Sequence, residues 1–151
     1  MKQKKQKKKL ISWILLLAWM AFIFYMSQQT GQVSSGQSGK IVLLLSKIGI
    51  EISKDNISNI TFIIRKSAHF TEYFILYILL FNVIKHYIHT KKIIFYSIMG
   101  VIIYAVSDEL HQYFVPERSS TIKDVFIDSC GGIVASIVNN LFYKVKNIIK
   151  I

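Results

Sequence analysis

Apolar residues along this chain gather in four long blocks that are separated by short polar stretches. The blocks are residues 10–26, 68–84, 93–107 and 122–143, and the first of them contains no charged residue. Each is close to the roughly 20 residues that cross a bilayer core, and polar flanks can complete the shorter ones. The pattern predicts an all-α fold: a polytopic membrane protein whose domain, residues 10–143, is a bundle of four transmembrane helices.

The segment between the first two blocks changes character along its length. Residues 28–39 are rich in Ser, Gly and Gln, which is typical of a loop. Residues 41–52 are apolar but short, and they contain Lys47 and Gly49, so we expect a short interfacial helix in this first outer loop. The second transmembrane helix is expected to open near Arg65.

Composition narrows the class of protein further. Hydrophobic residues make up 52% of the 151 residues and charged residues only 18%, which excludes intrinsic disorder. The single Cys130 excludes an intramolecular disulfide framework and a multi-cysteine zinc site. The first apolar block is longer than a signal peptide core and no Ala-x-Ala cleavage site follows it, so an uncleaved helix is the better interpretation.

The net charge of +11 raises the question of a nucleic-acid partner, and the distribution of the charge answers it. With the N-terminus inside, 12 of the 19 basic residues flank the inner helix ends without an acid among them. These residues are Lys2, Lys4, Lys5, Lys7, Lys8, Lys9, Lys85, Lys91, Lys92, Lys144, Lys146 and Lys150. The outer segments carry all eight acids, including Glu51 and Asp55. The positive-inside rule therefore predicts a cytoplasmic basic N-terminus (1–9), a cytoplasmic basic tail (144–151), and no nucleic-acid partner.

Polar residues converge where three helices meet the predicted outer face. The candidate site residues are Lys66, His69, Glu72 and Tyr73 on the second helix, Asp108, Glu109, His111 and Gln112 on the third, Arg118 in the following turn, and Asp124 and Asp128 on the fourth. Helical spacing puts most residues of each group on one face. Ionisable groups this close to lipid are costly, which favours a ligand site over a purely structural network, although Glu109 and Glu117 could simply be solvated loop charges.

The fourth helix adds two expectations. Asp124 and Asp128 share a face with Gly131 and Ala135, a small-residue pair that permits close helix contact. Arg118 is expected to pair with Asp108 or Asp124. Four acids are then expected to face inward with only two cations, Lys66 and Arg118, to balance their charge. At least one carboxylate should therefore hold a proton or recruit a metal or a ligand amine.

Four short motifs carry a resemblance to a known family. They are Met26-Ser27-Gln28-Gln29, then Lys66-x-x-His69-x-x-Glu72-Tyr73-x-x-Leu76, then Ser107-Asp108-Glu109-Leu110-His111-Gln112 with Pro116-x-Arg118, and finally Asp124-Val125-x-x-Asp128-x-x-Gly131. Together they resemble the VanZ-like family of bacterial integral membrane proteins, whose namesake is associated with resistance to the glycopeptide teicoplanin. Glu117 departs from the pattern, because the family usually carries Gly before this Arg. The resemblance implies a multi-pass protein of the bacterial plasma membrane and names no reaction.

Three functions remain open from the sequence. The first, which we favour, is a protein that binds or shields the headgroup of a membrane lipid or a lipid-linked cell-wall precursor, with Lys66 and Arg118 on phosphate. The second is an intramembrane hydrolase or transferase that acts on a lipid-linked phosphate, with His69 or His111 as general base and Glu72 and Asp108 as its orienters or acid partners. The third is a structural assembly protein. No HExxH or comparable ligand string is present, so the sequence predicts neither a metal nor another cofactor, and it does not define an oligomeric state.

Overall fold

The computed structural model describes residues 2–49, 52–53, 56–89, 92–118 and 120–148, and only the backbone of residues 144–148. Within these residues all regular secondary structure is helical: α1 (Lys2–Ser27), α2 (Gly31–Lys47), α3 (Ile57–Ile84), α4 (Lys92–Gln112) and α5 (Ile122–Ile148). Four of the helices, α1, α3, α4 and α5, are long and apolar enough to cross a membrane. The prediction of an all-α bundle of four transmembrane helices with a shorter fifth helix is therefore confirmed.

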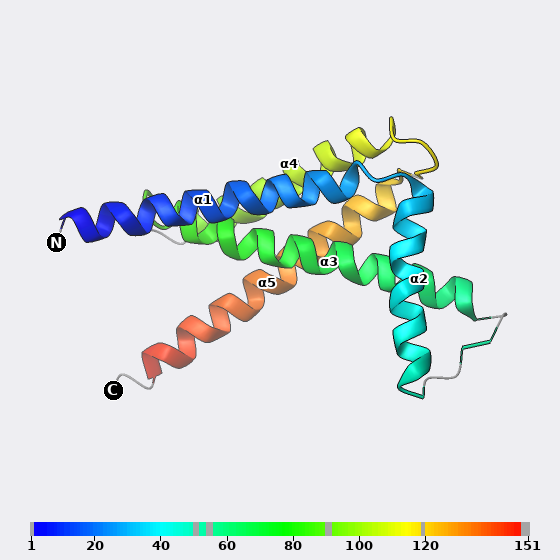
Figure 1. Ribbon diagram of the computed structural model, residues 1–151. Helices are drawn as coiled ribbons and strands as arrows, with labels where there is room; N and C mark the ends of the chain where they lie inside the picture. Colours follow the sequence, from blue (N-terminus) through cyan, green and yellow to red (C-terminus); the bar gives the residue numbers. More distant parts are fainter. Residues whose placement is uncertain (1, 50–51, 54–55, 90–91, 119, 149–151) are drawn as a thin grey trace.

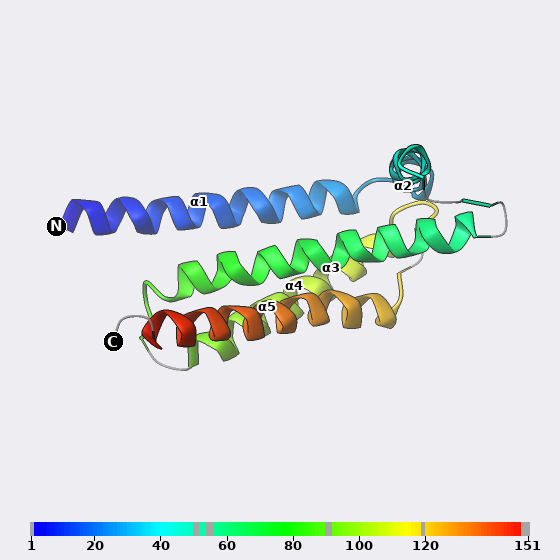
Figure 2. The same ribbon diagram turned by 90° about the horizontal axis from the view of Figure 1, so that it is seen from below.

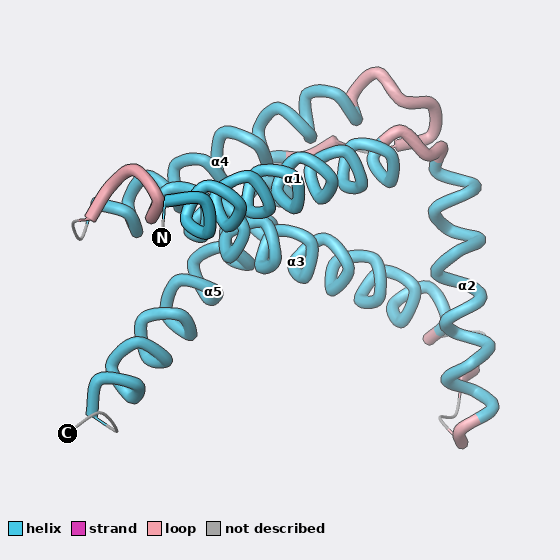
Figure 3. Tube along the Cα trace, turned by 60° about the vertical axis from the view of Figure 1, so that its left-hand side comes forward, coloured by secondary structure: helices cyan, strands magenta, loops and turns pink. Residues whose placement is uncertain are grey.

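The bundle is organised around α3, which contacts all four other helices. The helices α1 and α4 run alongside it, whereas α5 packs against α3 near its own start and diverges toward the C-terminus (Figures 1 and 3). The short α2 lies crosswise over one end of the bundle, and both chain termini lie at the opposite end (Figures 1 and 2). We call the end covered by α2 the polar end and the other the terminal end.

The surface of the long helices is apolar, as a lipid-facing surface must be. Leu17, Ile103 and Phe142 are 57%, 63% and 74% exposed, and many other large apolar side chains are similarly uncovered. A water-soluble monomer rarely exposes apolar area on this scale, whereas hydrocarbon chains would cover it. The interior is correspondingly narrow, with Tyr73 and Tyr77 of α3 among its largest fully buried side chains.

The polar segment after α1 differs from its prediction. The predicted loop 28–39 is mostly helical, because α2 begins at Gly31. The helix ends at Lys47, so it starts and ends earlier than the predicted interfacial helix 41–52. The Thr30 side chain caps this helix by accepting a hydrogen bond from the backbone N–H of Val33. Serine and glutamine are compatible with a helix whose first turn is capped by this hydrogen bond. Residues 50–51 of the predicted interfacial helix lie outside the described residues.

The transmembrane helices also extend beyond the apolar blocks. Helix α1 includes the lysine-rich segment from Lys2, since lysine is a good helix former. Helix α3 begins at Ile57 and not near Arg65, which adds about two turns at the polar end. The charge pattern that predicted the topology includes Glu51, Asp55, Lys91 and Lys150, which lie outside the described residues.

Glycine sets the close approach of α5 to α3. A Cβ atom on Gly131 would lie 2.3 Å from the backbone oxygen of Phe70, far inside any real contact. Ala135, one turn further, is 1% exposed. The predicted small-residue face of the fourth helix is thus its buried face, and it brings Asp128 up against α3.

Candidate functional site

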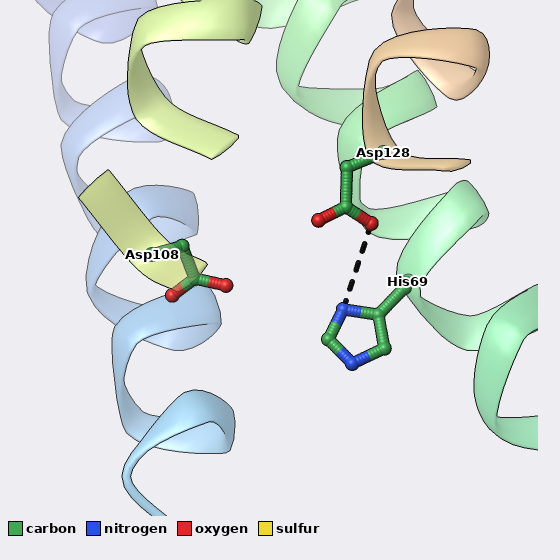
Figure 4. Close-up of side chains that lie close together, drawn as sticks. All are labelled: His69, Asp108 and Asp128. Atoms are coloured by element: carbon green, nitrogen blue, oxygen red, sulfur yellow. Dashed lines mark ion pairs between the residues drawn. The ribbon is translucent and has the colours of Figure 1, made fainter. Parts of the chain in front are cut away.

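The polar end contains three ionisable side chains that meet between three helices. His69 of α3, Asp108 of α4 and Asp128 of α5 place one nitrogen or oxygen atom each within 4.8 Å of the others (Figure 4). The Nδ1 atom of His69 lies 3.7 Å from Oδ1 of Asp128 and 3.9 Å from Oε2 of Glu72. We call His69, Asp108 and Asp128 the buried cluster. The sequence predicted only that these residues lie at the same end of the bundle, and the structure brings them together.

The buried cluster lies below the membrane boundary. Each of its residues is about 15 residues, or about 22–24 Å of helix, from the terminal end of its apolar span. A hydrocarbon core is about 30 Å thick, so a core that starts at the terminal end extends past all three side chains. Ionisable groups at this depth need internal partners, because lipid offers none.

A separate ion pair joins α3 to α5 one turn above the cluster. The ammonium group of Lys66 donates to Oδ1 of Asp124. Tyr73, which is fully buried, packs its ring near Tyr104 and turns its hydroxyl toward Asp108. The lysine that the sequence assigned to phosphate is therefore held by a carboxylate in this structure.

Arg118 fastens the turn after α4 to the end of α1. Its Nε and Nη2 donate to the backbone oxygens of Gln29 and Met26 at 2.9 and 2.8 Å, and Nη1 donates to Oε1 of Gln112 at 3.4 Å. Gln112 in turn donates to Ser27 and to Asp108. Among the described residues Arg118 makes no ion pair, so the expected pairing with Asp108 or Asp124 is wrong, because backbone oxygens occupy its guanidinium.

The backbone of Glu117 adopts a conformation in this turn that glycine adopts more easily. Its φ is +60°, the left-handed region that glycine adopts freely and other residues adopt at a cost. Its carboxylate accepts hydrogen bonds from the backbone N–H and the side-chain amide of Gln32 at 3.3 and 3.1 Å. A Cβ atom on Gly31 would meet the Glu117 backbone oxygen at 2.0 Å, so α2 and the turn pack without space between them. Despite the Glu, the turn is formed, and Glu117 contacts α2.

Two predicted candidates lie apart from the buried cluster. Glu109 is buried at 4% exposure, which excludes a solvated loop charge, and its Oε2 accepts from the backbone N–H of Thr121. Thus Glu109 fixes the start of α5. His111 stacks on Phe24 of α1 with ring centroids 4.7 Å apart. The structure does not bring His111 to His69, which leaves His69 as the imidazole of the site.

A cavity of about 130 Å³ lies beside the buried cluster, between α1, α2 and α3, and we call it the polar cavity because most of its lining residues are polar or charged. Its charged lining residues are Arg65, His69, Glu72 and Arg118. Helix α2 contributes Ser34, Gln37 and Ser38. Among the described residues Arg65 forms no hydrogen bond or ion pair. The sequence alone does not assign Arg65 or the α2 residues to the site, because its pattern predicts a loop over most of α2.

Fold and site together define a multi-pass α-helical membrane protein with ionisable residues buried at one end of the bundle. A family model described as VanZ/LLP1 matches residues 12–143, which is most of the chain, and the chain belongs to this family. Comparison with curated proteins and with solved structures gave no match.

Proposed function

We propose that the protein binds the phosphate-bearing headgroup of a lipid in the polar cavity. The supporting observation is that two guanidinium groups line this cavity and one of them, Arg65, has no partner among the described residues. Arg65 lies about 28 Å along α3 from Ile84, which is near the boundary of a hydrocarbon core of about 30 Å. Lipid phosphates lie at that boundary.

The chemistry of the cavity fits an anionic headgroup. An arginine fork binds phosphate through two parallel hydrogen bonds, and in this site that role falls to Arg65. The neighbouring Ser34 and Gln37 would contribute neutral donors and acceptors for hydroxyl groups of a glycerol or sugar. Arg118 adds positive charge while its hydrogen bonds hold the wall of the cavity. A membrane phospholipid and a lipid-linked cell-wall precursor share this chemistry.

The orientation of the protein is part of the proposal. The lysines at the terminal end support cytoplasmic termini, and the polar end would then lie at the outer face of the bacterial plasma membrane. Cysteine labelling of intact cells tests this on a Cys130→Ala background. A cysteine at position 36, in α2, should react with an impermeant reagent, and one at position 4 should react only after lysis. The reverse pattern would place the cavity on the cytoplasmic side.

The binding experiment uses two lipids that differ only in the phosphate. Native mass spectrometry of the purified protein should retain a polyprenyl phosphate in preference to the polyprenol of equal length. Arg65→Gln should reduce this retention at least tenfold, and Lys123→Gln should not, because Lys123 is an exposed cation at the same end. Competition by inorganic phosphate alone would identify free phosphate as the ligand. Equal retention of both lipids would contradict the proposal.

The family resemblance adds a physiological proposal, a contribution to glycopeptide resistance. Expression in a teicoplanin-susceptible bacterial host should raise the inhibitory concentration of teicoplanin, and Arg65→Gln should abolish the increase at equal membrane abundance. An unchanged inhibitory concentration for the wild-type protein would remove resistance from the proposal without affecting lipid binding.

A second candidate function is hydrolysis or transfer at a lipid-linked phosphate. His69 favours it, because its ring lines the polar cavity and its Nδ1 lies between carboxylates of Asp128 and Glu72. A carboxylate can orient an imidazole that accepts a proton from an attacking hydroxyl. Phosphate release from a polyprenyl diphosphate, lost in His69→Gln, would support this function. Bound lipid recovered unchanged after prolonged incubation would exclude it for that substrate.

A further inference from the structure

The three side chains of the buried cluster are arranged as ligands of a metal ion are. They come from three different helices and point toward one another (Figure 4), with one donor atom each inside a 4.8 Å span. Divalent first-row metals bind nitrogen and oxygen at about 2.0–2.2 Å, so two ligands of one ion lie about 3–4 Å apart. The 3.7 Å between His69 Nδ1 and Asp128 Oδ1 falls in that range.

Asp128 provides an independent indication of a bound cation. It is 0% exposed, and among the described residues neither of its carboxylate oxygens has a hydrogen-bond partner. The Nδ1 atom of His69, which faces it, lacks a hydrogen bond as well. Buried polar atoms are almost always hydrogen-bonded, and a buried carboxylate without a donor is especially unfavourable.

Among the described residues, the lysine and arginine nearest the two aspartates have other partners. Lys66 is paired with Asp124, and the guanidinium of Arg118 donates to backbone oxygens and to Gln112. Within the described part of the chain, neither Asp108 nor Asp128 forms an ion pair with a lysine or arginine. Two carboxylates carry two negative charges when ionised, which is the charge that one divalent cation balances.

We propose that His69, Asp108 and Asp128 bind a divalent first-row transition metal ion. One imidazole and two carboxylates favour Mn²⁺, Fe²⁺ or Zn²⁺ over Ca²⁺ and Mg²⁺, which prefer oxygen ligands alone. Glu72 lies 3.9 Å from His69 Nδ1 and is placed to orient that ring or to complete the coordination. The site does not depend on the proposed lipid binding, although His69 also borders the polar cavity.

Metal binding is measured on the full-length protein, purified without a polyhistidine tag, stripped with chelator and reconstituted in nanodiscs of zwitterionic lipid. After equilibration with Mn²⁺ or Zn²⁺ and removal of free ion, elemental analysis should give one ion per chain. Electron paramagnetic resonance of Mn²⁺ gives the affinity. Mg²⁺ at the same concentration should not displace the ion.

Variants identify the ligands. Asp128→Asn, Asp108→Asn and His69→Gln should each weaken binding at least 100-fold, whereas Glu72→Gln should weaken it about tenfold, as an outer-shell partner does. Asp124→Asn, one turn earlier on α5, is the matched control and should keep one ion per chain. Thermal unfolding supplies a second measurement: the ion should raise the melting temperature of the wild-type protein and leave that of Asp128→Asn unchanged.

Two results would overturn the proposal. One is folded wild-type protein that retains no stoichiometric ion. The other is any folded cluster variant that binds Mn²⁺ as tightly as the Asp124→Asn control, because that would place the ion elsewhere. Three ligand variants are included so that the misfolding of one leaves two that decide the question. Lipid binding that survives in metal-free protein would keep the proposed function intact when the metal site fails.

Discussion

The two ends of this helix bundle differ in where their charged side chains lie. At the terminal end the charges surround the helix ends: Lys9 lies over the ring of Tyr87 at 4.0 Å, and Lys85 donates to Asn82. Burial and then the charge of Lys85 lower the pKa of His86, whose ring contacts the hydroxyl group of Ser12. Among the described residues of the terminal end, these partners are the neutral side chains of Tyr87, Asn82 and Ser12, and none of them is a carboxylate.

At the polar end the charges are inside the bundle. Asp108, Glu109 and Asp128 are almost completely buried, while Lys66 pairs with Asp124 and Arg118 donates to backbone oxygens. Surface lysines need only water and lipid headgroups, whereas buried carboxylates need a specific internal environment. The difference is what the proposed lipid site and the proposed metal site would explain, because both lie at the polar end.

The largest effect should come from the contact that forms the polar end. Gly131→Ala should destabilise the protein by about 3 kcal/mol, since the added methyl group would collide with the Phe70 backbone, which cannot rotate away. Thermal unfolding followed by circular dichroism in detergent measures the loss. Gly36→Ala in α2 is the control, because a Cβ atom there has no neighbour within 4 Å, and it should be neutral or slightly stabilising. Equal melting temperatures for the two variants would mean that α3 and α5 are further apart than the structure has them.

A smaller effect is expected when a cation is exchanged while its charge is kept. Arg118→Lys should cost about 2 kcal/mol, because one ammonium group cannot hold Met26, Gln29 and Gln112 together. The reciprocal exchange at the terminal end, Lys9→Arg, should leave stability unchanged, as either cation can lie over Tyr87. Unfolding curves of lipid-free protein compare the two. If both exchanges are tolerated, the polar end is no more specific about its cations than the terminal end.

The sequence predicted the four membrane helices and the common face of Asp128 and Gly131, because hydrophobic length and helical period are local properties. It missed most of α2. Ser and Gly lower helix propensity, and the contact of α2 with the Glu117 turn depends on residues far along the chain. The start of α3 was also misplaced: the helix begins at Ile57, about two turns before the predicted start near Arg65.

The site was predicted as a set of residues and not as an arrangement. Spacing could place His69 and Glu72 on one face, but it could not show that backbone oxygens of α1 would take the guanidinium of Arg118. The proposed metal site has no local sequence motif either, because its three ligands lie on separate helices. The sequence did not predict Arg65 as a site residue for a similar reason, since the cavity that it lines depends on the position of α2.

The smallest expected effect concerns the turn at the polar end that departs from the family pattern. Glu117→Gly should change stability by no more than about 1 kcal/mol, because relief of the left-handed backbone offsets the loss of the hydrogen bonds to Gln32. Glu117→Ala loses the same hydrogen bonds and keeps the unfavourable backbone, so it should be less stable than the glycine variant by about 1 kcal/mol. Unfolding in detergent, with both variants and the wild type in one series, measures this order. An alanine variant as stable as the glycine variant would show that the turn does not require φ near +60°, and that Glu117 reaches Gln32 from an ordinary backbone conformation.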